Sequence, residues 1–211
     1  GAMSVAQFKS VTGEQLAALS TDQMTSFLPE HWAALSTQQA ASLTGEQLAV
    51  LGDDQVKALK GTVLASLDGE SQLAAMSADQ IKLFDAKQIA ALSSDQLSKL
   101  SSDQIADWGD AQIQAINLTA VATLSNDFVA GLSTTQVTAL TDKQVKALTA
   151  SQLGAMSTDQ VAAIDGKDLL GLTAAELNTL SSEQFNAMSK AQIQSLSAAQ
   201  ISNLDDEIIQ G

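Results

Sequence analysis

The sequence contains no cysteine, no tyrosine, one histidine and one proline among its 211 residues. Without cysteine, the chain forms neither a disulfide framework nor a thiol nucleophile, and its redox compartment stays open. No apolar run approaches the roughly 18 residues of a membrane span, so we expect no membrane insertion. Basic residues number 10 against 24 acidic ones, for a formal net charge of −14. Such a chain is not expected to bind nucleic acid, because phosphate contacts need clustered Lys and Arg.

A secretory signal is also not recognisable, since residues 3–20 already follow the repeat described below. Residues 1–2, Gly1-Ala2, are expected to be an expression scar. The sequence would then be a fragment of a longer protein, which leaves its targeting open.

What the sequence does contain is a repeat of eight residues, represented by residues 156–163, Met-Ser-Thr-Asp-Gln-Val-Ala-Ala. A single continuous array of 26 such octads fills residues 3–211, with one register slip at residues 67–75. The first and sixth places are apolar throughout, and the eighth is mostly small. The second place is Ser, Thr, Asp, Asn or Gly in 24 octads, and the fifth place is Gln in 19.

Each octad has the features of a helix N-terminus. Ser157 and Gln160 have the spacing of a capping box, in which each side chain bonds the other residue's amide. Met156 and Val161 have the spacing of a hydrophobic staple. Asp159 would lie at the second helical position, where the helix dipole favours an anion. The only proline, Pro29, falls on the first helical position, where proline is tolerated.

One long helix is excluded, because eight residues at 100° each overshoot two turns by about 80° and would wind the apolar places around the helix. The octads must therefore be short helices separated by corners. Helices this short are unstable alone and persist only when neighbours stack. We predict an all-α solenoid of about 26 short capped helices, one per octad.

The main alternative is a β-solenoid of octapeptide coils. It fits less well, because the first and sixth places have unlike parity, whereas one strand face requires a spacing of two. The exceptions to the octad pattern reveal no period of 16 or 24 residues. The number of helices per superhelical turn is therefore left open.

Several octads depart from the pattern. Residues 67–75 carry one extra residue between cap and Gln, which predicts a loosened corner or bend, with a functional hinge or ligand loop as the alternative. Residues 59–66 have Lys60 as cap and Val63 in the Gln place. Residues 116–131 have Ala120 and Phe128 in the Gln place.

The only histidine, His31, occupies a Gln place beside Glu30. We interpret it as a substitute capping side chain. A lone His can act as an acid or base, but the chain has no cysteine nucleophile and no second His to complete a metal site. Catalysis at His31 is not expected.

Acidic residues recur in the fourth place, where the helix dipole accounts for them. Rows of carboxylates could bind divalent cations weakly and without specificity, but no calcium-binding loop is present. The fourth-place acids are Glu14, Asp22, Glu30, Glu46, Asp54, Asp79, Asp95, Asp103, Asp127, Asp159, Glu183 and Glu207.

The aromatic residues stand mostly in apolar places, and core packing is the expected role, with an exposed binding anchor as the alternative. Those in apolar places are Phe8, Phe27, Trp32, Phe84, Trp108 and Phe185, while Phe128 stands in a Gln place. The sequence shows no phosphate-binding loop, nucleophile elbow or paired-carboxylate site. We predict no catalytic, metal or cofactor-binding residues, no cofactor and no enzyme activity.

The stretch 140–148, Leu-Thr-Asp-Lys-Gln-Val-Lys-Ala-Leu, resembles tandem repeats of large bacterial secreted or surface proteins, often described as adhesin-like or haemolysin-like. The resemblance covers the whole array and supplies no site residue. It implies an extracellular or cell-surface spacer or interaction module; a cytoplasmic location is the alternative.

Two functional hypotheses follow. The first is a non-enzymatic structural spacer or protein-interaction solenoid within a larger bacterial protein, with an unknown protein partner. The second is an acidic superhelix that mimics nucleic acid and binds a DNA-binding protein. The second requires a regular row of carboxylates, and Thr62, Lys87, Ala111 and Thr135 interrupt the fourth-place row.

Overall fold

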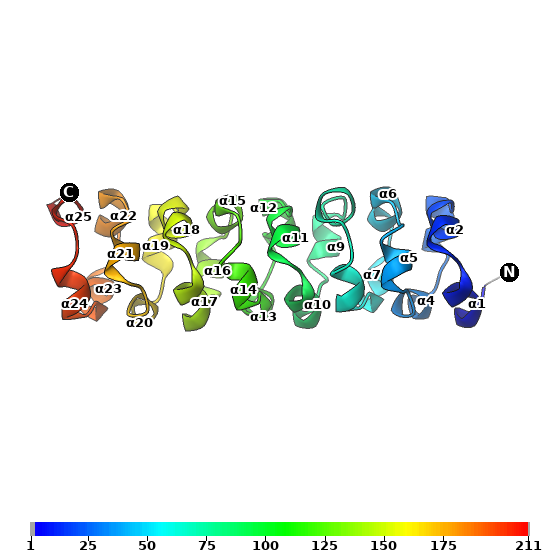
Figure 1. The fold of residues 1–211 in the computed structure, drawn as a ribbon, viewed down its shortest axis with the longest axis horizontal. Coiled ribbons are helices and arrows are strands. Elements are labelled where there is room, and N and C mark those ends of the chain that lie inside the picture. Colours follow the sequence, from blue (N-terminus) through cyan, green and yellow to red (C-terminus); the bar gives the residue numbers. More distant parts are fainter. Residues whose placement is uncertain (1–2, 211) are drawn as a thin grey trace. The chain divides into compact units, whose positions relative to one another are not determined.

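The structure, a computed structural model, describes residues 3–210, and within that range it is helical with no strand (Figure 1). The predicted all-α solenoid of short capped helices, one per octad, is confirmed, and the β-solenoid alternative is wrong for these residues. The expected expression scar, residues 1–2, lies outside the described residues. The helices pack into two compact units, Gly1–Asp107 and Trp108–Gly211.

Every described element is four to six residues long. The N-terminal unit contains α1 (Val5–Ser10), α2 (Gly13–Ala17), α3 (Thr21–Thr25), α4 (Pro29–Ala33), α5 (Thr37–Ala40), α6 (Gly45–Ala49), α7 (Asp53–Ala58), α8 (Gly61–Leu64), the π-helix η1 (Gly69–Leu73), α9 (Ala78–Ile81), α10 (Ala86–Ala91), α11 (Ser94–Ser98) and α12 (Ser102–Ile105).

The C-terminal unit contains α13 (Asp110–Ala115), α14 (Leu118–Val121), α15 (Asn126–Ala130), α16 (Thr134–Ala139), α17 (Asp142–Ala147), α18 (Ala150–Ala155), α19 (Thr158–Ala163), α20 (Gly166–Leu169), α21 (Ala174–Leu177), α22 (Ser182–Asn186), α23 (Lys190–Ser195), α24 (Ala198–Ser202) and α25 (Asp206–Gln210).

The capping box that the octad predicts starts the helices. At α19, the Ser157 hydroxyl accepts from the Gln160 amide at 3.1 Å, and Gln160 Oε1 accepts from the Ser157 amide at 2.7 Å. The helix ends at Ile164, whose extended backbone turns the chain into the next cap. The weak unit at Lys60 lacks a side-chain cap bond, and Pro29 lies at the first helical position of α4.

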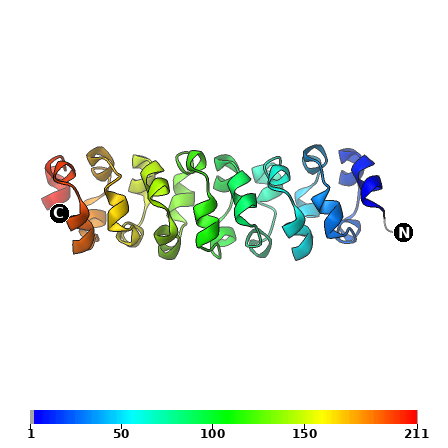
Figure 2. The same ribbon diagram turned by 90° about the horizontal axis from the view of Figure 1, so that it is seen from below.

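Three octads make one turn of the superhelix in each unit. In the N-terminal unit, α1 contacts α4 and α4 contacts α7; in the C-terminal unit, α16 contacts α19 and α19 contacts α22 (Figure 2). Three octads of eight residues form a turn of 24 residues, so octads 24 residues apart lie on the same side of a unit. The first-place and sixth-place side chains fill the interior, and nearly all are buried.

The small residues of the octad permit close approach between turns. A Cβ placed on Gly45 would lie 2.3 Å from the Ser71 carbonyl oxygen and 2.7 Å from the Ala75 methyl group. Gly45 is in the third place of its octad and Ala75 is in the last place of the octad three units later. Glycine is therefore required at this contact by space, since its backbone has no positive φ.

The register slip is absorbed inside a helix. The amides of Leu73 and Ala74 donate to the carbonyls of Asp68 and Gly69, five residues back, at 2.9 and 3.0 Å, which makes η1 a π-helical turn. The Asp68 carboxylate accepts from both the amide and the hydroxyl of Ser71 at 2.6 Å. These hydrogen bonds, the hydroxyl's first, lower the pKa of Asp68. The expected loosened corner is therefore wrong, because the cap is intact.

Candidate functional site

The recurring polar feature of both units is a buried glutamine that joins one turn to the preceding one. Fifteen glutamine side chains are at most 8 % exposed. At Gln144, Oε1 accepts from the Thr141 amide at 3.0 Å, while Nε2 donates to the carbonyls of Ile113 at 2.8 Å and Ile116 at 2.9 Å. Those two carbonyls lie at a corner of the preceding turn. We call this set of contacts the glutamine ladder.

The ladder has a fixed sequence offset. Gln39, Gln144 and Gln200 each donate to carbonyls 31 and 28 residues earlier in the chain. Four glutamines whose bonds span the extra residue of η1 donate instead to carbonyls 32 and 29 residues earlier: Gln72, Gln80, Gln88 and Gln96. The π-turn therefore keeps the ladder continuous through the insertion.

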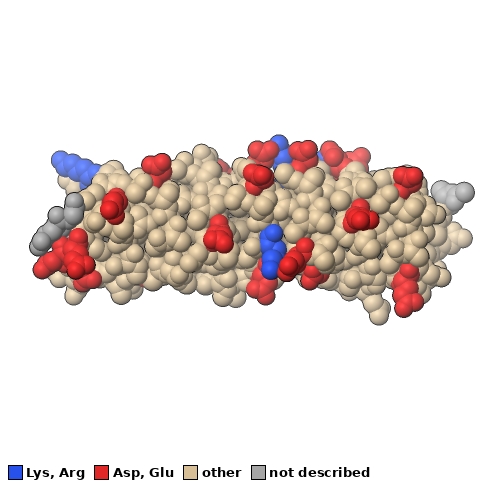
Figure 3. Space-filling view, turned by 90° about the horizontal axis from the view of Figure 1, so that it is seen from above, with Lys and Arg blue, Asp and Glu red and all other residues tan. Residues whose placement is uncertain are grey.

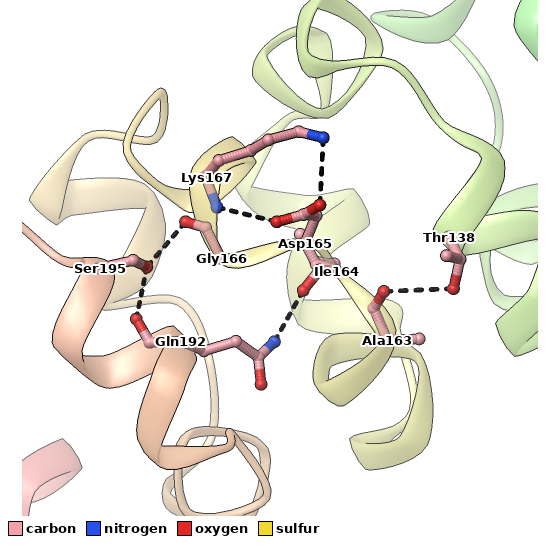
Figure 4. A network of polar contacts seen from close by, with 8 residues as sticks. All are labelled: Thr138, Ala163, Ile164, Asp165, Gly166, Lys167, Gln192 and Ser195. Carbon is pink, nitrogen blue, oxygen red and sulfur yellow. Dashed lines mark hydrogen bonds and ion pairs between the residues drawn. The ribbon is translucent and has the colours of Figure 1, made fainter.

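Figure 4 shows one step of the ladder with the contacts around it. Gln192 Nε2 donates to the Ile164 carbonyl at 2.9 Å. The Ser195 hydroxyl is within hydrogen-bonding distance of two carbonyl oxygens, that of Gly166 at 2.7 Å and that of Gln192 at 2.6 Å. Ser195 is an eighth-place residue, so the small place also supplies a polar contact between turns.

His31 occupies a ladder position and acts as a glutamine would. Its Nδ1 accepts from the Leu28 amide at 3.2 Å, so the ring proton is on Nε2, which donates to the Met3 carbonyl at 2.8 Å. The side chain is 4 % exposed and packs edge-on against Phe8. The interpretation of His31 as a substitute capping side chain is confirmed, and the ring also takes the inter-turn role that the sequence did not reveal.

Two ladder positions carry acids, which cannot donate when ionised. Asp168 is 3 % exposed and its Oδ1 has no hydrogen-bond partner. Burial raises the pKa of this carboxyl, and the nearby Lys167 partly opposes that shift. Glu176, in the next octad, still accepts the capping-box hydrogen bond, from the Thr173 amide at 2.6 Å. Neither side chain supplies the amide donors that the ladder uses elsewhere.

The fourth-place acids form rows once octads three apart are placed together. Two rows follow consecutive turns of the N-terminal unit: Glu30, Asp54, Asp79, Asp103; and Asp22, Glu46, Asp95, with Glu70 of the slipped octad between Glu46 and Asp95. The C-terminal unit has the row Asp159, Glu183, Glu207. The interrupting residues Thr62 and Lys87 lie on the third side of the N-terminal unit. The contacts between turns thus reveal a 24-residue period that the exceptions to the octad pattern do not show.

The rows are solvated and sparse. All eight carboxylates of the two N-terminal rows are exposed, and on the face drawn in Figure 3 acidic groups stand singly or in small clusters on mostly uncharged surface. Lys99 contacts Glu70 at 3.0 Å, an exposed ion pair of little energetic weight. Among residues 3–210 no three His, Asp or Glu side chains are arranged to hold a metal ion.

The aromatic residues divide between core and partial exposure. Trp32, Phe8, Phe84 and Trp108 are at most 3 % exposed. Phe27 and Phe185 are only partly buried. Core packing is confirmed for the first four, and the Trp32 indole nitrogen has no hydrogen-bond partner.

A surface depression lies at one of the contacts between turns. It has a volume of about 520 Å³, lies where α2 meets α5 and is lined by Lys9, Val11, Thr12, Gly13, Glu14, Ser36, Gln38, Gln39 and Ser42. None of the helices described is long and apolar enough to cross a membrane.

Residues 161–198 match the family described as the ALTTAQ repeat. The match lies within the C-terminal unit and includes the ladder residues Gln184 and Gln192. It defines the class of the protein as a tandem-repeat protein over that segment. No curated protein matches the chain.

The ladder predicts that the side-chain amide group of the glutamine stabilises the fold beyond its role in helix capping. Gln144→Glu keeps the acceptor for the Thr141 amide but replaces the two donated hydrogen bonds with a buried carboxylate. We expect a loss of unfolding free energy of about 2–4 kcal/mol, measured as a lowered urea midpoint. Gln15→Glu is the matched control, because exposed Gln15 has the same Thr cap and makes no inter-turn bond. Equal effects in both variants would contradict the ladder.

Replacing Asp168 should increase the free energy of unfolding, by an amount that depends on pH. Because its folded pKa is raised, the folded chain holds this proton more tightly than the unfolded chain. The destabilisation is therefore absent below the ordinary pKa of 3.8 and grows as pH rises through the folded value. We expect Asp168→Asn to stabilise the C-terminal unit by about 1–3 kcal/mol at neutral pH. The gain should shrink toward zero as pH falls below 4. Exposed Asp159→Asn is the control, and a gain that persists in acid would contradict this assignment.

Proposed function

We propose that the chain is a non-enzymatic structural spacer or protein-interaction solenoid within a larger bacterial secreted or surface protein. The observation that carries this proposal is how the octad uses its side chains. The first, second, fifth, sixth and eighth places serve capping, stapling and the contact between turns. The fourth and seventh places, and the third place where it does not approach the next turn as Gly45 does, are left for the solvent-facing sides, and solenoids present such surfaces to partners. The ALTTAQ-repeat match supports a repeat module.

The second candidate is an acidic superhelix that mimics nucleic acid. The rows formed by stacked octads support it, although the series of fourth-place acids along the sequence is interrupted. Its weakness is charge density. Packed helices lie about 8–10 Å apart, so a row offers one carboxylate per about 8–10 Å. One DNA strand carries a phosphate per about 3.4 Å of axis. Each row is thus about one third as dense, and the spacer or interaction module ranks first.

A binding assay on the immobilised full chain separates these roles. Its ligands are solubilised bacterial and host surface components in one arm and a purified basic DNA-binding protein in the other. The row variant is Asp54→Asn/Asp79→Asn/Asp103→Asn. The matched control, Glu14→Gln/Asp110→Asn/Asp127→Asn, removes the same charge from exposed positions outside the rows.

We expect retention of a surface component that is released by salt and lost in the row variant but not in the control. Retention of the DNA-binding protein alone, with competition by DNA, would favour mimicry instead. Failure to retain anything in either arm would contradict the interaction role and leave the spacer role.

A further inference from the structure

One turn of the C-terminal unit has acids at two consecutive ladder positions. Asp168 of α20 and Glu176 of α21 occupy the fifth place of their octads, where Gln is usual. Of the three octads in residues 164–187, only the third keeps a ladder glutamine, Gln184. Among the described residues, two of the three sides of this turn therefore lack the amide donor that joins turns elsewhere.

The ladder offset identifies the carbonyls that these two acids leave without a donor. In nearby octads, Gln160 and Gln192 donate to carbonyls 31 and 28 residues earlier. No side-chain amide of the described residues donates to the carbonyls at the same offset from the acids. We call this contact, in which α20 packs on α17 and α21 packs on α18, the acid seam. Its carbonyls are those of Val137 and Leu140 for Asp168, and of Val145 and Leu148 for Glu176.

The lysines near Asp168 bind other carboxylates. Lys167 Nζ is 3.1 Å from the Asp165 carboxylate (Figure 4). Lys146 Nζ is 3.7 Å from the Asp142 carboxylate. No ion pair within residues 3–210 includes Asp168. An ionised carboxylate only accepts hydrogen bonds, whereas a protonated carboxyl also donates one. A proton therefore gives this buried side chain both a neutral charge and the donor that glutamine supplies elsewhere.

We propose that the acid seam binds protons and closes when it does. Each protonated carboxyl donates its O–H to a corner carbonyl of the preceding turn, as a glutamine amide does. Each ionised carboxylate instead brings negative oxygen toward carbonyl oxygens, and an unpaired buried charge is costly. The seam then opens locally, while α19 and α22, which keep their ladder glutamines, stay packed. Because the seam lies between turns, this proposal is independent of partner binding on the solvent-facing sides.

The charged groups around the seam determine how it responds to pH. α18 and α24, which pack against α21, have no charged residue. Burial raises the pKa of Asp168, and Lys167 most strongly opposes that shift. The closed seam therefore holds this proton more tightly than an open one. Closure gains stability as pH falls through the raised pKa and is complete below the ordinary pKa of 3.8. The charged residues on the octad of Asp168 and on α17 and α23, which pack against α20, are Asp165, Lys167, Asp142, Lys143, Lys146 and Lys190.

Hydrogen–deuterium exchange of the full chain at about pH 4 and about pH 7 tests the proposal. Each measured rate is compared with the intrinsic rate at the same pH, so that the protection factor reports opening alone. At neutral pH, backbone amides of α17, α20 and α21 should be less protected than those of α19 and α22. In acid their protection factors should rise at least about tenfold, while those of α19 and α22 change little.

Two matched variants separate the seam from a general effect of charge. Asp168→Gln/Glu176→Gln restores the ladder, since Gln fills this place in most octads. It should show at neutral pH the protection that wild type reaches in acid, with no further rise. The control Asp127→Asn/Asp159→Asn removes two exposed carboxylates and should keep the wild-type pH dependence.

Equal protection of α17 and α20 at both pH values would overturn the proposal, as would a rise shared by α19 and α22. So would pH dependence that survives in the ladder-restoring variant. Protection gained at neutral pH on adding calcium, and absent from that variant, would assign the seam to a metal ion in place of a proton and would overturn it too.

Discussion

The structure depends on one constraint, which is that a buried side-chain amide must find partners for all of its polar atoms. At each corner the helix runs out of backbone donors, so a carbonyl such as that of Ile113, which accepts from the Ile116 amide at 3.2 Å, can still take a second donor. Gln144 meets both needs at once, since its side-chain oxygen accepts from the cap amide and its side-chain nitrogen donates to two carbonyls of the preceding turn. A hydrogen bond contributes only about 1 kcal/mol net, but a buried group left unpaired costs about 1–3 kcal/mol. The glutamine therefore specifies which corner stacks on which.

Other features follow from keeping this contact in place. Each cap ends one short helix and starts the next, so every octad places its side chains in the same way. Each turn therefore presents its corner carbonyls to the glutamines of the next turn. The π-turn at η1 absorbs an extra residue while Gln72 still reaches the carbonyls of Ala40 and Leu43. His31 substitutes for glutamine because its two ring nitrogens can accept at the cap and donate across the turn. Val63, by contrast, fills the same place with an apolar side chain and leaves that step without an amide.

The sequence predicted what is local and missed what depends on stacking. Capping box, staple and short helix all lie within eight residues, so residues 156–163 sufficed to predict α19. Gln144 contacts residues about 30 positions away in the sequence, which a pattern of eight residues does not reveal. The number of octads per turn does not follow from the repeat either, because every octad has the same pattern. For the same reason the acidic rows could not be recognised, since Glu30 and Asp54 become neighbours only when three octads form a turn. The extra residue at residues 67–75 is visible in the sequence, but spacing alone does not distinguish a loose corner from a π-turn.

Together these features show that most side chains of the octad serve to start a helix or to stack one turn on the next. The measurement that tests the ladder most directly is solvent exchange of the glutamine side-chain amide protons, followed by NMR. Protons on Nε2 of Gln39, Gln144 and Gln200 should be protected, while those of Gln7, Gln15 and Gln23 in the monomer should exchange as in a free peptide. Rapid exchange at all six glutamines would contradict the claim that buried amides join the turns.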